Sequence, residues 1–222
     1  SLGPGWSVSR YGSPGGGVLT PAAVSHTWKG DDPGAVWDAD QLDDATTNTP
    51  TGAREVATFG DGATTTNVSV EAGSGAGPTV GAIRLEGGTS YNLNAGGGTI
   101  TMDSNAPGDP GTIVAASAAV DHTIAAPIAL SSDLNIDVQA AGRKVTISGA
   151  VSGAKSVTKR GPGTVVVSGA SSYGGGTTVE AGQWMLGAGM PAAGNSPVGT
   201  GTVTLAGGTL GASGTRTLSR AL

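Results

Sequence analysis

Residues able to do acid–base or metal chemistry are few in this chain and poorly spaced for it. The two histidines, His26 and His122, lie far apart in the sequence and outside any metal-ligand spacing. We predict that each is a surface or partly packed strand residue. With so few histidines no Ser-His-Asp arrangement can be assembled, and the absence of cysteine removes thiol nucleophiles, disulfides and cysteine zinc sites.

An acidic loop is the first of two charged clusters that could form a site. Its members are Asp31, Asp32, Asp38, Asp40, Asp43 and Asp44. Carboxylates are the ligands that Ca²⁺ prefers, but the spacing fits neither an EF-hand nor the nonapeptide calcium repeat. We therefore favour a solvated loop, and we interpret Gly60-Asp61-Gly62 as a turn. The prediction is that the chain has no metal site and no cofactor.

A basic cluster is the second candidate. It consists of Arg143, Lys144, Lys155, Lys159 and Arg160. A polysaccharide lyase would use such bases with acids in a groove, and a glycosidase would need two carboxylates across a cleft, for which only Asp133 and Asp137 are near. We favour a soluble, non-catalytic flank. A carbohydrate-binding face would need exposed aromatic side chains, and outside the N-terminal region only Tyr91, Tyr173 and Trp184 could supply them.

The elements that carry these residues are predicted to be short β-strands between glycine turns. The 41 glycines and 12 prolines of the 222 residues punctuate segments in which apolar and small polar residues alternate. The stretch 157–187 contains four such segments, with apolar positions at Val157, at Val165 and Val167, at Val179 and Ala181, and at Trp184 and Leu186. None can bury its apolar face alone, so the pattern predicts an all-β solenoid of stacked strands. Only the Ala-rich run 112–120 leaves room for a helical turn.

The chain divides into an arm and one solenoid domain. Residues 1–22 form a Gly/Pro-rich arm, which lies on the body or pairs with an open edge of a neighbouring molecule. Residues 23–222 form the solenoid, with a cap and first coil at 23–65 and further coils at 66–222. Because a bare terminal coil exposes its core and backbone edge, we expect Trp28, Trp37 and Phe59 to form an aromatic plug there.

Charge and hydropathy restrict the partners and the location. The net charge of −5 argues against nucleic acid and anionic membranes, which both attract basic surfaces. No apolar run is long enough to span a bilayer. The chain starts at Ser1 without a signal peptide, which suggests a processed form or a piece of a longer chain.

The stretch 157–187 resembles the autotransporter-associated β-strand repeat family of exported bacterial proteins. The matching segments, in order, are Val157-Thr158-Lys159, Gly161-Pro162-Gly163-Thr164, Ser168-Gly169-Ala170, Tyr173, Gly175-Gly176-Thr177-Thr178-Val179, Ala181-Gly182 and Leu186-Gly187. Trp184 and Met185 depart from the family pattern and suggest a wider or exposed apolar spot. The resemblance implies a right-handed parallel β-helix on the cell exterior, and no particular chemistry.

From these observations we expect a secreted or cell-surface structural solenoid that associates with copies of itself, end to end, into a filament, sheath or layer. Arg216–Leu222 aligns with His122–Ile128, so the last residues are expected to begin a strand and leave an uncapped edge. The residues predicted to take part in self-association are Trp6, Tyr11, Val18, Leu19, Thr217, Leu218, Arg220 and Leu222. The alternatives are an adhesin or stalk fragment of an autotransporter passenger, and a β-helix that binds a surface glycan or degrades a polysaccharide.

Overall fold

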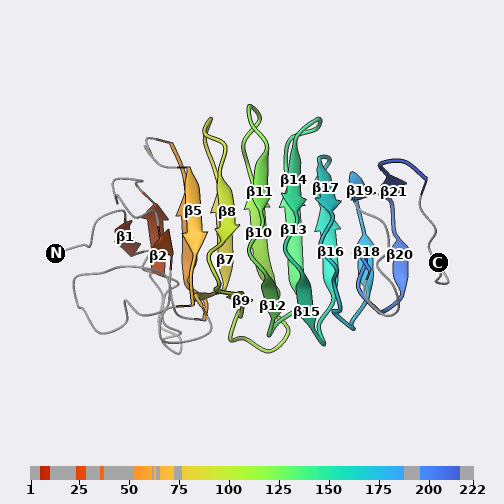
Figure 1. Cartoon of the computed structure of the whole chain (residues 1–222), viewed down its shortest axis with the longest axis horizontal. Coiled ribbons are helices and arrows are strands. Elements are labelled where there is room, and N and C mark those ends of the chain that lie inside the picture. The colour runs from red at the N-terminus through yellow and green to blue at the C-terminus, as the bar shows by residue number, and fades with distance from the viewer. Residues whose placement is uncertain are drawn as a thin grey trace, which may run out of the picture.

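The part of the chain that the structure describes is built from short β-strands. The computed structural model describes residues 6–10, 24–28, 36–37, 53–61, 63, 66–72, 77–187 and 196–215. Its strands lie in sheets of 9, 8 and 4 strands, stacked side by side along one long axis (Figure 1). This arrangement confirms the all-β solenoid predicted from the strand pattern. None of the described residues forms a helix that could span a membrane.

Each coil of the chain contributes one strand to the first sheet, then one to the second and, in the middle coils, one to the third. The first sheet contains, in spatial order, β1 (Trp6–Arg10), β2 (Val24–Trp28), β4 (Val56–Phe59), β7 (Ala82–Leu85), β10 (Gly111–Ala115), β13 (Leu134–Val138), β16 (Val157–Arg160), β18 (Thr177–Val179) and β20 (Val203–Leu205). The second contains β3 (Val36–Trp37), β5 (Asn67–Val70), β8 (Asn92–Ala95), β11 (His122–Ile124), β14 (Lys144–Ile147), β17 (Thr164–Val167), β19 (Gln183–Leu186) and β21 (Thr209–Ala212). The third contains β6 (Thr79–Val80), β9 (Ile100–Met102), β12 (Ile128–Leu130) and β15 (Val151–Gly153).

The core consists of ladders in which inward side chains of successive coils stack on one another. All strand pairs are parallel except β1 with β2, so equivalent residues come into register from coil to coil. The central ladder of the first sheet is Ala57, Ile83, Ile113, Ile136, Lys159, Val179 and Leu205. Since each coil covers the apolar side chains of the coil before it, a coil cannot bury its own core in isolation.

The alternating runs 80–85 and 123–130 are each divided between two sheets. β6 ends at Val80 and β7 begins at Ala82, with Gly81 at the corner, where a Cβ would lie 2.6 Å from the Arg54 Cα. The run 123–130 is interrupted before Pro127, which has no N–H to donate to a ladder. Of the Ala-rich run 112–120, the first residues belong to strand β10, and no helical turn follows.

At the N-terminal end of the described residues, an antiparallel strand forms the edge of the first sheet and aromatic side chains fill the core. β1 pairs with β2, with Trp6 opposite Trp28. The ring of Phe59 lies 6.3 Å from that of Trp28 and 5.6 Å from that of Trp37, and all three are buried. This confirms the predicted aromatic cluster. Tyr91 extends it inward, with its ring 5.4 Å from Phe59, so these four residues form what we call the aromatic cluster.

The opposite end, which we call the C-terminal coil, comprises residues 196–215 and contains β20 and β21. These strands lie at the edges of the first and second sheets (Figure 1). Leu205 is 46% exposed although its ladder partner Val179 is fully buried. The predicted division into residues 1–22, 23–65 and 66–222 stays a prediction.

Candidate functional site

Lys159, predicted to lie in an exposed basic flank, is buried in the core. It stands in the central ladder between Ile136 and Val179 and is 0% exposed. Its backbone position faces inward because inward and outward residues alternate along β16. The prediction of an exposed side chain was therefore wrong for this residue, since strand register outweighs its usual preference for solvent.

Hydrogen bonds to backbone carbonyls compensate the loss of water around the buried Lys159 ammonium. Nζ donates to the carbonyl oxygen of Arg160, to that of Gly161 at 2.7 Å and to that of Ala181 at 3.3 Å. Gly161 and Ala181 lie at corners of successive coils, so one side chain ties two coils together. Burial lowers the pKa of Lys159 to about 8, and the negative charge of Asp137 acts in the opposite direction.

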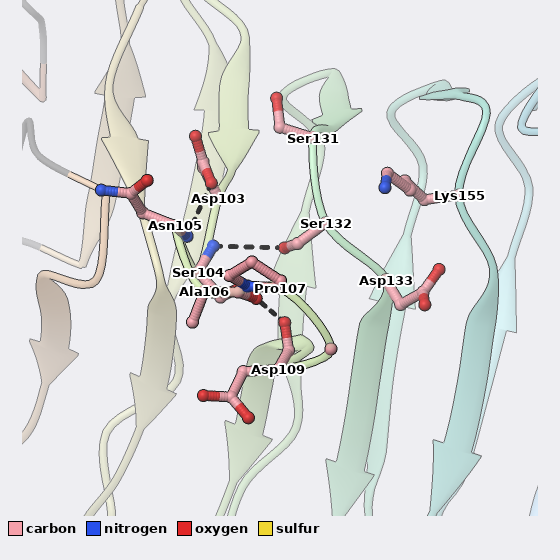
Figure 2. Close-up of a pocket in the computed structure, with 11 residues that line it drawn as sticks. Asp103, Ser104, Asn105, Ala106, Pro107, Asp109, Ser131, Ser132, Asp133 and Lys155 are labelled. Atoms are coloured by element: carbon pink, nitrogen blue, oxygen red, sulfur yellow. Dashed lines mark hydrogen bonds between the residues drawn. The ribbon is translucent and has the colours of Figure 1, made fainter.

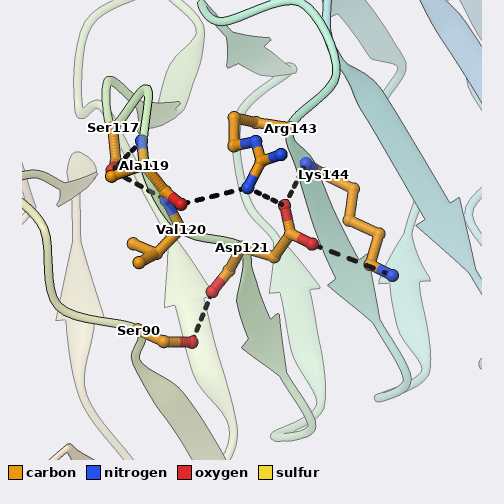
Figure 3. A network of polar contacts seen from close by, with 7 residues as sticks. All are labelled: Ser90, Ser117, Ala119, Val120, Asp121, Arg143 and Lys144. Atoms are coloured by element: carbon orange, nitrogen blue, oxygen red, sulfur yellow. Dashed lines mark hydrogen bonds and ion pairs between the residues drawn. The ribbon is translucent and has the colours of Figure 1, made fainter.

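Arg143 and Lys144 are engaged by Asp121 (Figure 3). The Asp121 carboxylate lies 3.9 Å from Arg143 Nη1 and 3.8 Å from Lys144 Nζ, and it accepts the Lys144 backbone N–H at 2.9 Å. Arg143 also donates to the carbonyl of Ala119 at 3.0 Å, and Ser90 donates to the carbonyl of Asp121 at 2.5 Å. These contacts fix the 116–121 turn onto its neighbouring coils.

Arg160 is engaged by Glu180, its Nε donating to the carboxylate at 2.9 Å. With Lys159 buried and three members of the cluster paired with acids, the five basic residues do not form one positive patch.

A polar pocket of about 260 Å³ lies on the side of the solenoid, between the loop that follows β9 and the corners of the next coils (Figure 2). Asp103, Asp109 and Asn105 line the loop side, and Asp133 and Lys155 line the other. The hydroxyl of Ser132 accepts the backbone N–H groups of Ser104 and Gly111, each at 3.2 Å. The loop is thus hydrogen-bonded to the solenoid wall.

The acids Asp133 and Asp137 each have a hydrogen-bond partner of their own. Asp133 accepts the backbone N–H and the hydroxyl of Ser156, both at 2.9 Å, and the backbone hydrogen bond is the main cause that lowers its pKa. A general acid needs the opposite shift. Asp137 accepts a hydrogen bond from the Gln139 side chain at 3.1 Å. Among the described residues, no group of His, Cys, Asp or Glu is placed to hold a metal ion.

His122 is a core residue, 2% exposed, rather than a surface residue. Its ring stacks on that of Tyr91 at 6.4 Å, and its Nδ1 accepts the Tyr91 backbone N–H at 3.2 Å. Burial lowers the pKa of His122, while the neighbouring Asp121 acts to raise it. The imidazole is thus a neutral acceptor inside the stack. Of the other histidine, His26, only the backbone position in β2 is described.

The aromatic residues considered for glycan binding are all in the core. Tyr91, Tyr173 and Trp184 are each 1% exposed. Trp184 stacks in register between Val165 and Leu210, so the departure from the family pattern at this position exposes no aromatic ring. None of these three rings is therefore exposed at the surface.

Most of the predicted self-association residues and the acidic loop lie outside the described residues. Those outside are Tyr11, Val18, Leu19, Thr217, Leu218, Arg220, Leu222, Asp31, Asp32, Asp38, Asp40, Asp43 and Asp44. Of Trp6, the structure describes the backbone, which pairs with Trp28 of the same chain.

The C-terminal coil is the surface whose chemistry differs most from the rest. It has no Asp, Glu, Lys or Arg, and from Gly161 to Thr215 the sole charged residue is Glu180. Exposed strand edges are usually protected by charge, by proline or by a covering segment. In the sequence, the run without charged residues between Glu180 and Arg216 is the signal that distinguishes this coil.

Parallel coils around stacked apolar ladders define this protein as a parallel β-solenoid. Residues 157–183 match the family model of the passenger-associated transport repeat. The chain therefore carries an autotransporter-associated β-strand repeat, as the resemblance of 157–187 predicted. A comparison with curated proteins and one with solved structures gave no match.

Proposed function

We propose that this chain is a structural β-solenoid of a secreted or cell-surface protein, that it has no catalytic role, and that it associates with copies of itself through its coil ends. The observation that carries the proposal is the uncharged C-terminal coil with the 46% exposed Leu205. An edge of this kind gains backbone hydrogen bonds and apolar contact from any added strand. The passenger-associated repeat supports the location outside the cell.

The absence of a catalytic role is supported by how the polar groups are used. Asp121, Glu180 and Asp133 serve as partners of neighbouring coils, Lys159 binds turn carbonyls, and His122 accepts a backbone N–H. In a repeated coil, such contacts contribute to stability, which supports a structural role for these five side chains.

Sedimentation and electron microscopy of the purified chain test self-association. We expect a concentration-dependent oligomer, which Leu205→Asp dissociates and Leu134→Val, a conservative change inside the core, does not. A chain that stays monomeric across the micromolar to millimolar range would contradict the proposal. End-to-end growth into a filament, sheath or layer is the larger assembly that we propose to follow from such contacts.

A second candidate is a stalk segment within a longer autotransporter passenger, which the repeat at 157–183 favours. In that case further coils of the same polypeptide would cover β20 and β21. Mass determination of the native polypeptide separates the two candidates, because a stalk segment requires a mass well above 21.2 kDa.

A further inference from the structure

The two ends of the solenoid offer different edges to a second copy. At the N-terminal end, the edge strands are β1, with 5 residues, in the first sheet and β3, with 2 residues, in the second. At the C-terminal end, β20 and β21 have 3 and 4 residues and no strand beyond them among the described residues. A head-to-tail contact would join edges of unlike length, whereas two C-terminal ends match each other by identity.

We propose that two copies associate tail to tail, through their C-terminal coils, around a two-fold axis. The inference rests on the self-association proposed above and names its geometry. A two-fold axis perpendicular to the solenoid reverses the strand direction of the second copy, so that β20 pairs antiparallel with β20. Because the coil has no charged residue, a copy meets it without like-charge repulsion.

The backbone of β20 fits this pairing. The Thr202 carbonyl accepts the Thr177 N–H, and the Ala206 N–H donates to the Val179 carbonyl. The even-numbered residues of this segment therefore bond to β18. The backbone groups of Val203 and Leu205 therefore point to the open edge, since they alternate along a strand. A two-fold axis at Thr204 makes Val203 the hydrogen-bonded partner of Leu205 from the second copy.

The side chains agree with the same register. Val203 and Leu205 point inward, so each exposed Leu205 would lie beside a Val203 and continue the apolar core across the junction. In the second sheet, the backbone N–H groups of Thr209 and Ser213 donate to β19 or to the corner before it. The backbone groups of Leu210 and Ala212 therefore point to the open edge. The equivalent two-fold position there is Gly211, which has no side chain to obstruct a close approach.

Single-cysteine variants test the geometry directly, because the chain contains no cysteine. In an isologous contact Thr204 faces its own copy at about 4.5–5.5 Å between Cα atoms, within the range of a disulfide. Thr204→Cys should give a covalent dimer on mild oxidation, reversed by reductant. The matched control is Thr158→Cys, an outward threonine of the same ladder further inside the solenoid, which should give at least tenfold less dimer.

The outcomes separate this inference from the proposed function. Dimers in sedimentation, with crosslinking at Thr204 and a loss of at least tenfold in dimer affinity for Leu205→Asp, support tail-to-tail pairing. Filaments or larger oligomers without crosslinking at Thr204 overturn the two-fold geometry but agree with the proposed self-association. A monomer at every concentration, including one whose edge is covered by residues 216–222 of the same chain, overturns both.

Discussion

The two ends of the described solenoid differ in their edge strands and in how far their apolar core is buried. At the N-terminal end, β1 occupies the edge of the first sheet and Trp28, Trp37 and Phe59 fill the core beneath it. At the C-terminal coil, β20 and β21 remain at the sheet edges and Leu205 is 46% exposed. Aromatic side chains therefore fill the core at one end, whereas at the other end of the described residues an apolar side chain remains partly exposed.

The interior differs from both ends in how charge is used. Between β10 and β19, the acids Asp121, Asp133 and Glu180 connect neighbouring coils by hydrogen bonds or ion pairs. Lys159 does the same from inside the core, and after the ion pair of Arg160 with Glu180 no charged residue follows up to Thr215. The charged contacts therefore end shortly before the C-terminal coil, where apolar contact takes over.

The largest expected difference between the two ends comes from truncating one apolar side chain at each. Phe59→Ala removes the ring that contacts Trp28, Trp37 and Tyr91, and should lower the free energy of unfolding by about 3–5 kcal/mol. Leu205→Ala should cost less than about 1 kcal/mol at concentrations where the chain is monomeric, because much of that side chain is already in water. Urea unfolding at low protein concentration checks both, and equal losses would mean that the C-terminal coil is closed in the monomer.

Alkaline pH should stabilise the interior through Lys159. The folded pKa of this residue is about 8 against 10.5 for the free side chain, so the unfolded chain retains a proton that the folded chain has released. The free energy of unfolding should therefore rise between pH 8 and 10, by at most roughly 3 kcal/mol. The pKa of Tyr91 is raised by burial to about 12, which acts in the opposite sense above pH 10.

Lys159→Met is the variant that assigns this alkaline effect, because it keeps the length of the side chain and removes the titrating amine. Its free energy of unfolding should be flat over the same range, while Lys144→Met, at an exposed position, should keep the rise. A rise that persists in Lys159→Met would show that another group titrates and that Lys159 does not cause the alkaline stabilisation.

The smallest expected effect tests how far the aromatic cluster extends into the solenoid. The pKa of His122 is lowered by burial, so acidification from pH 7 to 5 should destabilise the fold, because the unfolded imidazole binds a proton that the folded one resists. The slope is at most about 1.4 kcal/mol per pH unit for one proton. His122→Phe keeps a ring in contact with Tyr91 and should reduce this slope, whereas an unchanged slope would show that another group causes it.

Much of the architecture could be predicted from the sequence because period-two alternation and glycine turns are local signals. The four strands of 157–187 correspond to β16, β17, β18 and β19, and the aromatic cluster lies where Trp28, Trp37 and Phe59 predicted it. Strand type, strand order and the positions of the apolar face follow from each segment's own residues. These features required no knowledge of which coil lies beside which.

The tertiary structure alone decided the environments of particular side chains. Register placed Lys159 in an aliphatic ladder and His122 in an aromatic stack, and corners at Gly81 and Pro127 divided two runs between sheets. Whether Leu205 is covered depends on a neighbouring coil and not on its own strand. The physical reason is that local alternation determines which way a side chain points, whereas its burial and partners come from coils distant in sequence.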